Sequence, residues 1–199
     1  MKKLRFVWIL LLLPLLHGCS GQIVSPSVPE HPRAIFVLDH GRHSSLVLSK
    51  PDGSLVRYSY GDWHYYAEGE TGLVQGTRAL FYQTQGALGR RLLPGPAEED
   101  AVFRQVRVGI VNLLHFQVEG AAVDRLDSEL DRLFRQNIHS YLYRAEYDLE
   151  FVHHPQPYTL RHNSNQVVAE WLRALGIEVY GRPILSRWRL LKQTDLANK

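Results

Sequence analysis

Side chains that could take part in catalysis are concentrated in three short segments of the chain. These are DHGRHSSLVL with His43, YSYGDW with Asp62, and HNSNQVVAEWLRALG with Ser164. A serine hydroxyl attacks a carbonyl only when a neighbouring base takes its proton and a third group orients that base. The three residue types are present, but a single histidine or serine is structural more often than catalytic.

The same segments also have purely structural interpretations. Asn163 can cap a helix, with Gln166 three residues later completing a capping box. Ser164 would then be an ordinary residue of the first helical turn. His43 can close a hairpin, and Asp62 follows a glycine, as aspartates in turns often do.

Metal binding is a further option, because the chain has 10 histidines. His40 and His43 are three positions apart, and His153, His154 and His162 precede the last predicted helix. None of them forms a His-Glu-x-x-His pattern, and one cysteine cannot build a cysteine-based site. We expect no metal and no cofactor, with zinc bound by His40, His43 and His162 as a minor alternative.

Hydrophobic periodicity predicts the elements that position these residues. Apolar runs predict an antiparallel meander of three strands at Ala34–Leu38, Ser44–Leu48 and Leu55–Tyr60. Spacings of three and four predict helices over Ala121–Gln136 and from Asn163 to Gly176. We also expect a short helix at Gln75–Phe81 and strands at Arg90–Leu93 and Phe103–Val108. The predicted class is α+β, a single domain over residues 34–199 in which an antiparallel sheet packs against helices.

In their order and spacing, the three segments resemble an uncharacterised family of bacterial proteins with a circularly permuted papain-like fold. That family has a histidine entering a strand, then an aromatic-Gly-Asp step, and much later an Asn-Cys-Asn step that opens a helix. The resemblance covers roughly residues 34–179. Related NlpC-type peptidases and lecithin-retinol-acyltransferase-like enzymes attack amide or ester bonds with that cysteine, and a histidine is the base.

The resemblance assigns His43 as the base and places Ser164, between Asn163 and Asn165, where the nucleophilic cysteine would be. A helix N-terminus lowers a pKa by only about 1.5 units. The hydroxyl of Ser164 would therefore stay protonated, whereas a thiol, with a pKa near 8.5, can ionise there. Catalysis would require His43 to remove the proton during the attack.

The chain differs from the family at the nucleophile, where serine replaces cysteine, and also at the group that would orient His43. The position at which the family carries an acidic residue is Arg57 here, which leaves Asp62 and Ser59 as candidates. An arginine facing the imidazole would lower the basicity of His43. We therefore expect a degenerate cleft more than an active one.

A cluster of aromatic residues follows the third predicted strand. It comprises Tyr58, Tyr60, Trp63, Tyr65, Tyr66, Phe81 and Tyr82. Tyrosine and tryptophan suit sites with one buried end and one wet end. We expect Tyr60, Trp63, Asn163 and Asn165 to line a cleft for a peptide, glycan or acyl chain, while about half of the aromatic cluster fills the core.

The only cysteine, Cys19, follows a basic start and an apolar run, Phe6–Leu16, of 11 residues. Such a run is too short to cross a bilayer, which needs about 20 residues. The arrangement resembles a bacterial lipoprotein signal peptide over residues 1–18. We expect Cys19 to be lipidated, residues 19–33 to form a tether, and Ser20 after the cysteine to direct the protein to the outer membrane, facing the periplasm.

The charge balance excludes one class of partner. Three of the 23 Lys and Arg residues lie in the signal, which leaves 20 against 20 Asp and Glu. A nearly neutral mature chain has no electrostatic footprint for nucleic acid. We expect a lipid-anchored envelope protein that binds a peptide, glycan or lipid. The alternatives are a serine-dependent amidase, esterase or acyltransferase and a purely structural lipoprotein.

Overall fold

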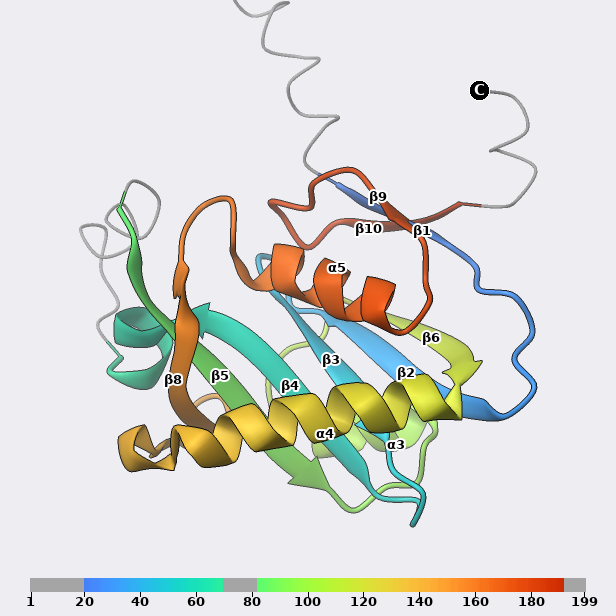
Figure 1. The fold of residues 1–199 in the computed structure, drawn as a ribbon, viewed down its shortest axis with the longest axis horizontal. Coiled ribbons are helices and arrows are strands. Elements are labelled where there is room, and N and C mark those ends of the chain that lie inside the picture. Colours follow the sequence, from blue (N-terminus) through green and yellow to red (C-terminus); the bar gives the residue numbers. More distant parts are fainter. Residues whose placement is uncertain (1–19, 70–81, 192–199) are drawn as a thin grey trace, which may run out of the picture.

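The structure is a computed structural model that describes residues 20–69 and 82–191. Its main feature is a seven-stranded antiparallel sheet with the order β6-β2-β3-β4-β5-β8-β7 (Figure 1). The strands are β2 (Pro32–Asp39), β3 (Ser44–Ser49), β4 (Leu55–Asp62), β5 (Thr84–Leu93), β6 (Asn112–Glu119), β7 (Leu142–Arg144) and β8 (Leu149–Tyr158). The α+β class predicted from the sequence is confirmed.

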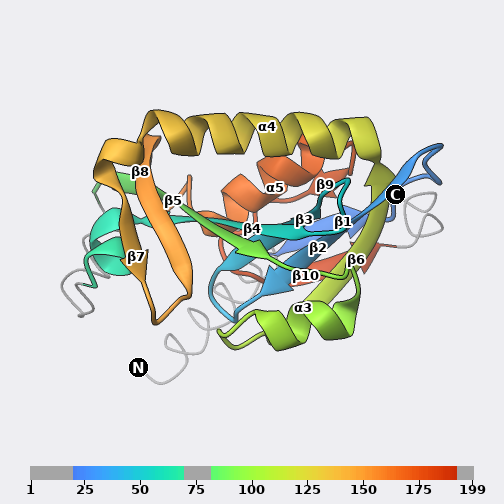
Figure 2. The same ribbon diagram turned by 90° about the horizontal axis from the view of Figure 1, so that it is seen from below.

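Helices cover both faces of this sheet. Figure 2 shows α4 (Gly120–Gln136) and α5 (Ser164–Ala174) on one face and α3 (Glu99–Gln105) on the other. Since successive side chains of a strand point to opposite faces, β2 serves two cores. Ile35 packs in the core under α4 and α5, and Phe36 packs in the core beside α3. Burial on both faces explains why β2 has a continuous apolar run instead of alternation.

A second, three-stranded sheet lies at the edge where the described chain begins and ends (Figure 1). Its central strand β1 (Gly21–Val24) pairs in parallel with β10 (Trp188–Leu191) and antiparallel to β9 (Val179–Tyr180). Ile23 is fully buried in the core. Within the described residues, strand β1 thus lies inside the segment 19–33 that we expected to be a tether.

Other strands depart from the sequence predictions. The strand predicted at Phe103–Val108 is wrong, because Phe103 lies in α3, which buries Ala101 and Val102 against the sheet. Strands β6 and β8 were not predicted. In β6, residues 114–119 alternate between apolar and polar, a strand signal that the prediction missed, whereas β8 contains two prolines and lacks a clean pattern.

The remaining predicted elements correspond to observed ones where the structure describes them. The three strands of the meander lie within β2, β3 and β4, the run Arg90–Leu93 is the end of β5, and the two helices are α4 and α5. The helix predicted at Gln75–Phe81 lies outside the described residues. In the part of the chain that the structure describes, no helix is both long and apolar enough to span a bilayer.

Candidate functional site

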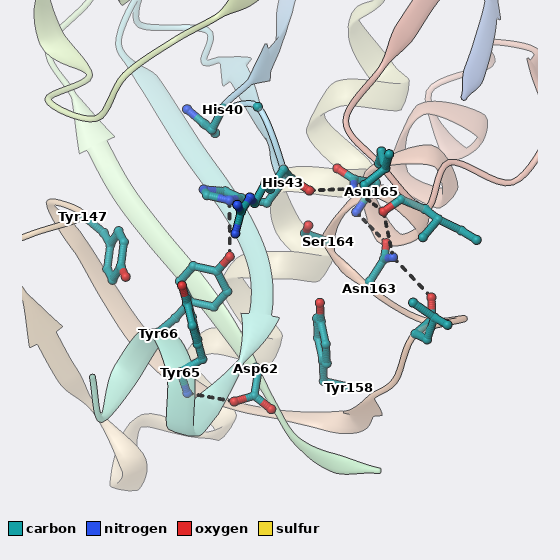
Figure 3. Close-up of a pocket in the computed structure, with 15 residues that line it drawn as sticks. His40, His43, Asp62, Tyr65, Tyr66, Tyr147, Tyr158, Asn163, Ser164 and Asn165 are labelled. Carbon is teal, nitrogen blue, oxygen red and sulfur yellow. Dashed lines mark hydrogen bonds between the residues drawn. The ribbon is translucent and has the colours of Figure 1, made fainter. Parts of the chain in front are cut away.

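A cavity of about 700 Å³ lies at the N-terminal end of α5 and brings the three sequence segments together (Figure 3). His43, Asp62 and Ser164 all line it, although His43 and Ser164 are far apart in the sequence. Its wall also contains the N-cap Asn163, Asn165 of the first helical turn, the four tyrosines Tyr65, Tyr66, Tyr147 and Tyr158, and, from loops, His40, Gly41, Arg42, Leu160, Ile184 and Leu185. The predicted meeting of the start of β3 with the start of α5 is therefore observed.

Asn163 fixes the point at which α5 begins. Its Oδ1 accepts hydrogen bonds from the backbone N–H groups of Asn165 at 3.0 Å and Gln166 at 3.1 Å. Its Nδ2 donates to the carbonyl of Ile184 at 3.2 Å. The N-cap predicted from the sequence is thus formed. Ser164 becomes the first residue of the helix, 4% exposed and at the cavity wall.

Asn165 holds the strand that bears His43 against this helix start. Its Nδ2 donates to the carbonyls of Arg42 at 3.1 Å and Ile184 at 3.0 Å. Its Oδ1 accepts from the hydroxyl of Ser44 at 2.8 Å, and that hydroxyl accepts from Trp188 Nε1 at 2.7 Å. Because Arg42 and Ser44 flank His43, the amide of Asn165 sets where the imidazole lies.

The ring of His43 has a phenol as its partner. The hydroxyl of Tyr66 lies 3.2 Å from His43 Nδ1, and the two rings pack edge to face (Figure 3). Tyr66 belongs to the π-helical turn η2 (Trp63–Ala67) that follows β4. Burial raises the pKa of Tyr66, so its hydroxyl stays protonated. The group that orients the imidazole is therefore neutral.

Arg57 lies behind the two histidines, buried at 3% exposure. Its Nε donates to the hydroxyl of Ser45 at 3.0 Å, and its Nη1 donates to the carbonyl of Tyr147 at 3.3 Å. Its Nη2 lies 3.3 Å from Nε2 of His40. The side chain thus points inward from β4, toward the histidines.

These surroundings keep both histidines uncharged. Burial, then the charge of Arg57, lowers the pKa of His43 to about 4, although Asp39 acts in the opposite direction. Burial and Arg57 also lower the pKa of His40 to about 3. Burial lowers the pKa of Arg57 only to about 10, so the guanidinium remains charged at neutral pH. A buried cation therefore lies near an imidazole whose charged form a carboxylate would stabilise in a serine hydrolase.

Asp62 lines the cavity, but its oxygens have other partners. Oδ1 accepts from the backbone N–H of Tyr65 at 2.7 Å, which caps the start of η2, and the hydroxyl of Thr84 donates to Oδ2. No hydrogen bond joins Asp62 to His43 within the described residues. Ser59 is buried in β4, and within the described residues no hydrogen bond joins it to His43 either.

Two residues predicted to line the cleft lie elsewhere. Tyr60 is buried in the main core, where its hydroxyl donates to the carbonyl of Gln156 at 3.1 Å. Trp63 packs in a separate core cluster, and its ring contacts His153. The prediction is corrected because the ring of Tyr60 packs against His162 and the ring of Trp63 against His153, outside the cavity wall. Tyr65 and Tyr66 replace them in the wall.

Several wall residues had no sequence signal. Tyr147 and Tyr158 come from the turn before β8 and from its end, and Leu160, Ile184 and Leu185 come from loops. No periodicity marks such positions. Only the three-dimensional approach of these loops to α5 identifies them.

The alternative zinc site is not assembled. The Nδ1 of His40 contacts the carbonyl of Gly109 at 2.8 Å, and its Nε2 contacts the hydroxyl of Ser45 at 2.9 Å. The Nδ1 of His162 contacts the hydroxyl of Tyr60 at 3.0 Å. Across residues 20–69 and 82–191, no group of three His, Cys, Asp or Glu side chains is arranged to hold a metal ion.

No protein-family model, curated protein or solved structure matches the chain. The function is therefore inferred from the sequence and from the geometry of the cavity.

Proposed function

We propose that this is a lipid-anchored protein of the bacterial cell envelope that binds a ligand in the cavity at the start of α5 without cleaving it. The observation that carries this proposal is the buried guanidinium of Arg57 beside His40 and His43. It supports a binding role because it opposes the charged imidazole on which serine catalysis depends.

Burial first, and the charge of Arg57 second, both act against a charged imidazole at His43. When a base removes the proton of a serine, an imidazolium forms, and a carboxylate normally stabilises it. A pKa of about 4 for His43, against an ordinary 6.5, makes that imidazolium about 3 kcal/mol less favourable than in water. The neutral hydroxyl of Tyr66 supplies no negative charge to compensate.

The wall of the cavity indicates what kind of ligand fits. Four tyrosines and three aliphatic side chains line it, together with the start of α5, two histidines and Arg42. Tyrosine combines an apolar ring with a polar end. The carboxylate of Asp62 is already hydrogen-bonded. These features favour a partly apolar part of a peptide, glycan or lipid.

The proposal includes a lipid anchor at Cys19 and descent from a papain-like enzyme. Lipidation of Cys19 would hold the protein at the outer membrane, facing the periplasm. A circularly permuted papain-like ancestry is consistent with the chain order, in which the strand start with His43 precedes the helix start with Ser164. The thiol of the ancestor would have been replaced by a hydroxyl.

A serine-dependent amidase, esterase or acyltransferase is the second candidate. It is favoured by one observation, that Ser164 and the ring of His43 line the same cavity at a helix N-terminus (Figure 3). In that enzyme the hydroxyl oxygen of Tyr66 would accept a hydrogen bond from Nδ1–H of His43 and leave Nε2 free to act as the base.

Filling the cavity tests the binding role. Protein purified from the envelope should carry a bound molecule in native mass spectrometry, and Ser164→Met should lose it because the larger side chain occupies the cavity. Ser128→Met, on the exposed surface of α4, is the matched control and should retain it. If both variants carried the same fraction of bound molecule, binding in this cavity would be contradicted.

A further inference from the structure

The connection between β9 and β10, residues 181–187, borders the cavity. Ile184 and Leu185 form part of its wall. The carbonyl of Ile184 accepts hydrogen bonds from Asn163 and Asn165, which fixes the connection against the start of α5. The mouth of the cavity therefore lies beside this connection.

The start of the described chain lies against the same connection. A Cβ at Gly181 would lie 2.7 Å from the carbonyl oxygen of Ser20, and one at Gly21 would lie 2.5 Å from the ring of Trp188. Gly21 also pairs with Trp188 in the sheet (Figure 1). Ser20 directly follows Cys19, and consecutive Cα atoms are about 3.8 Å apart. An acyl group on Cys19 would thus be attached next to the domain, with no long tether between them.

Three exposed arginines lie in the connection between β9 and β10 and in β10 itself. Arg182, Arg187 and Arg189 are all exposed, and the sequence from residue 179 to 191 contains no acidic residue. The mature chain as a whole has equal numbers of basic and acidic residues, so this is a local excess. One exposed carboxylate, Glu178, lies beside the segment and accepts a hydrogen bond from the hydroxyl of Tyr180 at 2.8 Å, so the three arginines still outnumber it.

Apolar side chains are exposed between these arginines. Tyr180 is 46% exposed, Leu185 37% and Leu190 50%. Arginine next to exposed leucine and tyrosine is the composition of a surface that lies at a membrane interface, where the cations meet anionic headgroups and the apolar groups enter the acyl boundary.

We infer that Tyr180, Arg182, Leu185, Arg187 and Arg189 form a membrane-contacting surface that binds an anionic phospholipid bilayer. The cavity then opens beside the bilayer, because Leu185 belongs both to this surface and to the cavity wall. The inference rests on the lipid anchor of the proposed function. It adds a fixed orientation of the domain, which an acyl chain on a flexible tether would not impose.

Site-specific quenching tests this orientation in the acylated protein. Once Cys19 is acylated, a cysteine introduced by Leu185→Cys is the only free thiol and takes a fluorophore. The protein is inserted into vesicles of equal parts phosphatidylcholine and phosphatidylglycerol that contain a lipid with a nitroxide on its acyl chain. Leu92→Cys, an exposed position near the end of β5, is the matched control.

We expect the label at position 185 to be quenched several-fold more than the label at position 92. Replacing Arg182, Arg187 and Arg189 by Gln should reduce this difference, whereas the same change at Arg104, Arg125 and Arg132 should not. Equal quenching at positions 185 and 92 would overturn the inference. So would a dimer in which position 185 is shielded by a second copy of the chain.

Flotation of the vesicles separates the two proposals. If the protein floats and position 185 is not quenched, the anchor stands and the membrane-contacting surface is wrong. If the protein does not float, the lipid anchor is wrong, and the inference falls with it.

Discussion

The Nη2 of Arg57 lies 3.3 Å from Nε2 of His40, and this hydrogen bond forms only with a neutral imidazole. Arginine can only donate, so Nε2 accepts. The Nδ1 of His40 lies 2.8 Å from the carbonyl of Gly109 and must donate to it, which leaves no second proton on the ring. The hydrogen bonds and the burial thus agree that a cation and an uncharged histidine are paired behind His43.

The first prediction concerns the basicity of His43. Because the charge of Arg57 lowers the pKa of His43, Arg57→Met should raise it above about 4. It should stay below 6.5, since burial, the larger cause, remains. Titration of the imidazole resonances by NMR measures the shift. Arg91→Met, on the neighbouring strand, is the control, and an unchanged pKa in Arg57→Met would show that the guanidinium does not act on His43.

The second prediction concerns stability in acid. The pKa values of His40, His43 and His154 are about 3, 4 and 4 in the folded protein and about 6.5 in the unfolded chain. Below pH 6.5 the unfolded chain binds more protons, so the free energy of unfolding falls as the pH falls toward 4. Each of these histidines contributes up to about 1.4 kcal/mol per pH unit to that slope.

Urea unfolding between pH 7 and pH 4 checks the slope. His43→Gln should make it shallower, because it removes one group whose pKa is lowered on folding. His31→Gln, at an exposed histidine, should leave the slope unchanged. A steeper or equal slope in His43→Gln would contradict the burial of a neutral imidazole.

The third prediction concerns the amide that joins β3 to α5. Asn165→Ala removes bonds to Arg42, Ile184 and Ser44 and leaves buried polar groups without partners. Such groups cost about 1–3 kcal/mol each when they are not exposed to water. We expect the free energy of unfolding to fall by about 3 kcal/mol in urea titrations. Asn112→Ala, at an exposed position of β6, should change it by less than about 0.5 kcal/mol.

The sequence predicted those parts of the fold that depend on local pattern. The apolar run of β2, the stripe of α4 and the cap at Asn163 each have a signal within a few residues. The order of the three segments also pointed to a meeting of His43 and Ser164, which the cavity brings together.

The parts that depend on distant contacts were missed. Strand β1 has only four residues and pairs with β10 from the other end of the chain, so no local pattern reveals it. Tyr60 and Trp63 were assigned to the cleft by residue type, but packing against His162 and His153, which are distant in sequence, holds them in core clusters. The inward direction of Arg57 is likewise a tertiary property, set by Ser45 and Tyr147.

Labelling with a fluorophosphonate probe tests the central claim, that the cavity binds without catalysis, most directly. The probe reacts with a serine only when a neighbouring base activates it. At pH 7 to 8 we predict no more labelling of the wild-type protein than of Ser164→Ala. Labelling at Ser164 that disappears in His43→Ala would contradict this account and identify a serine hydrolase.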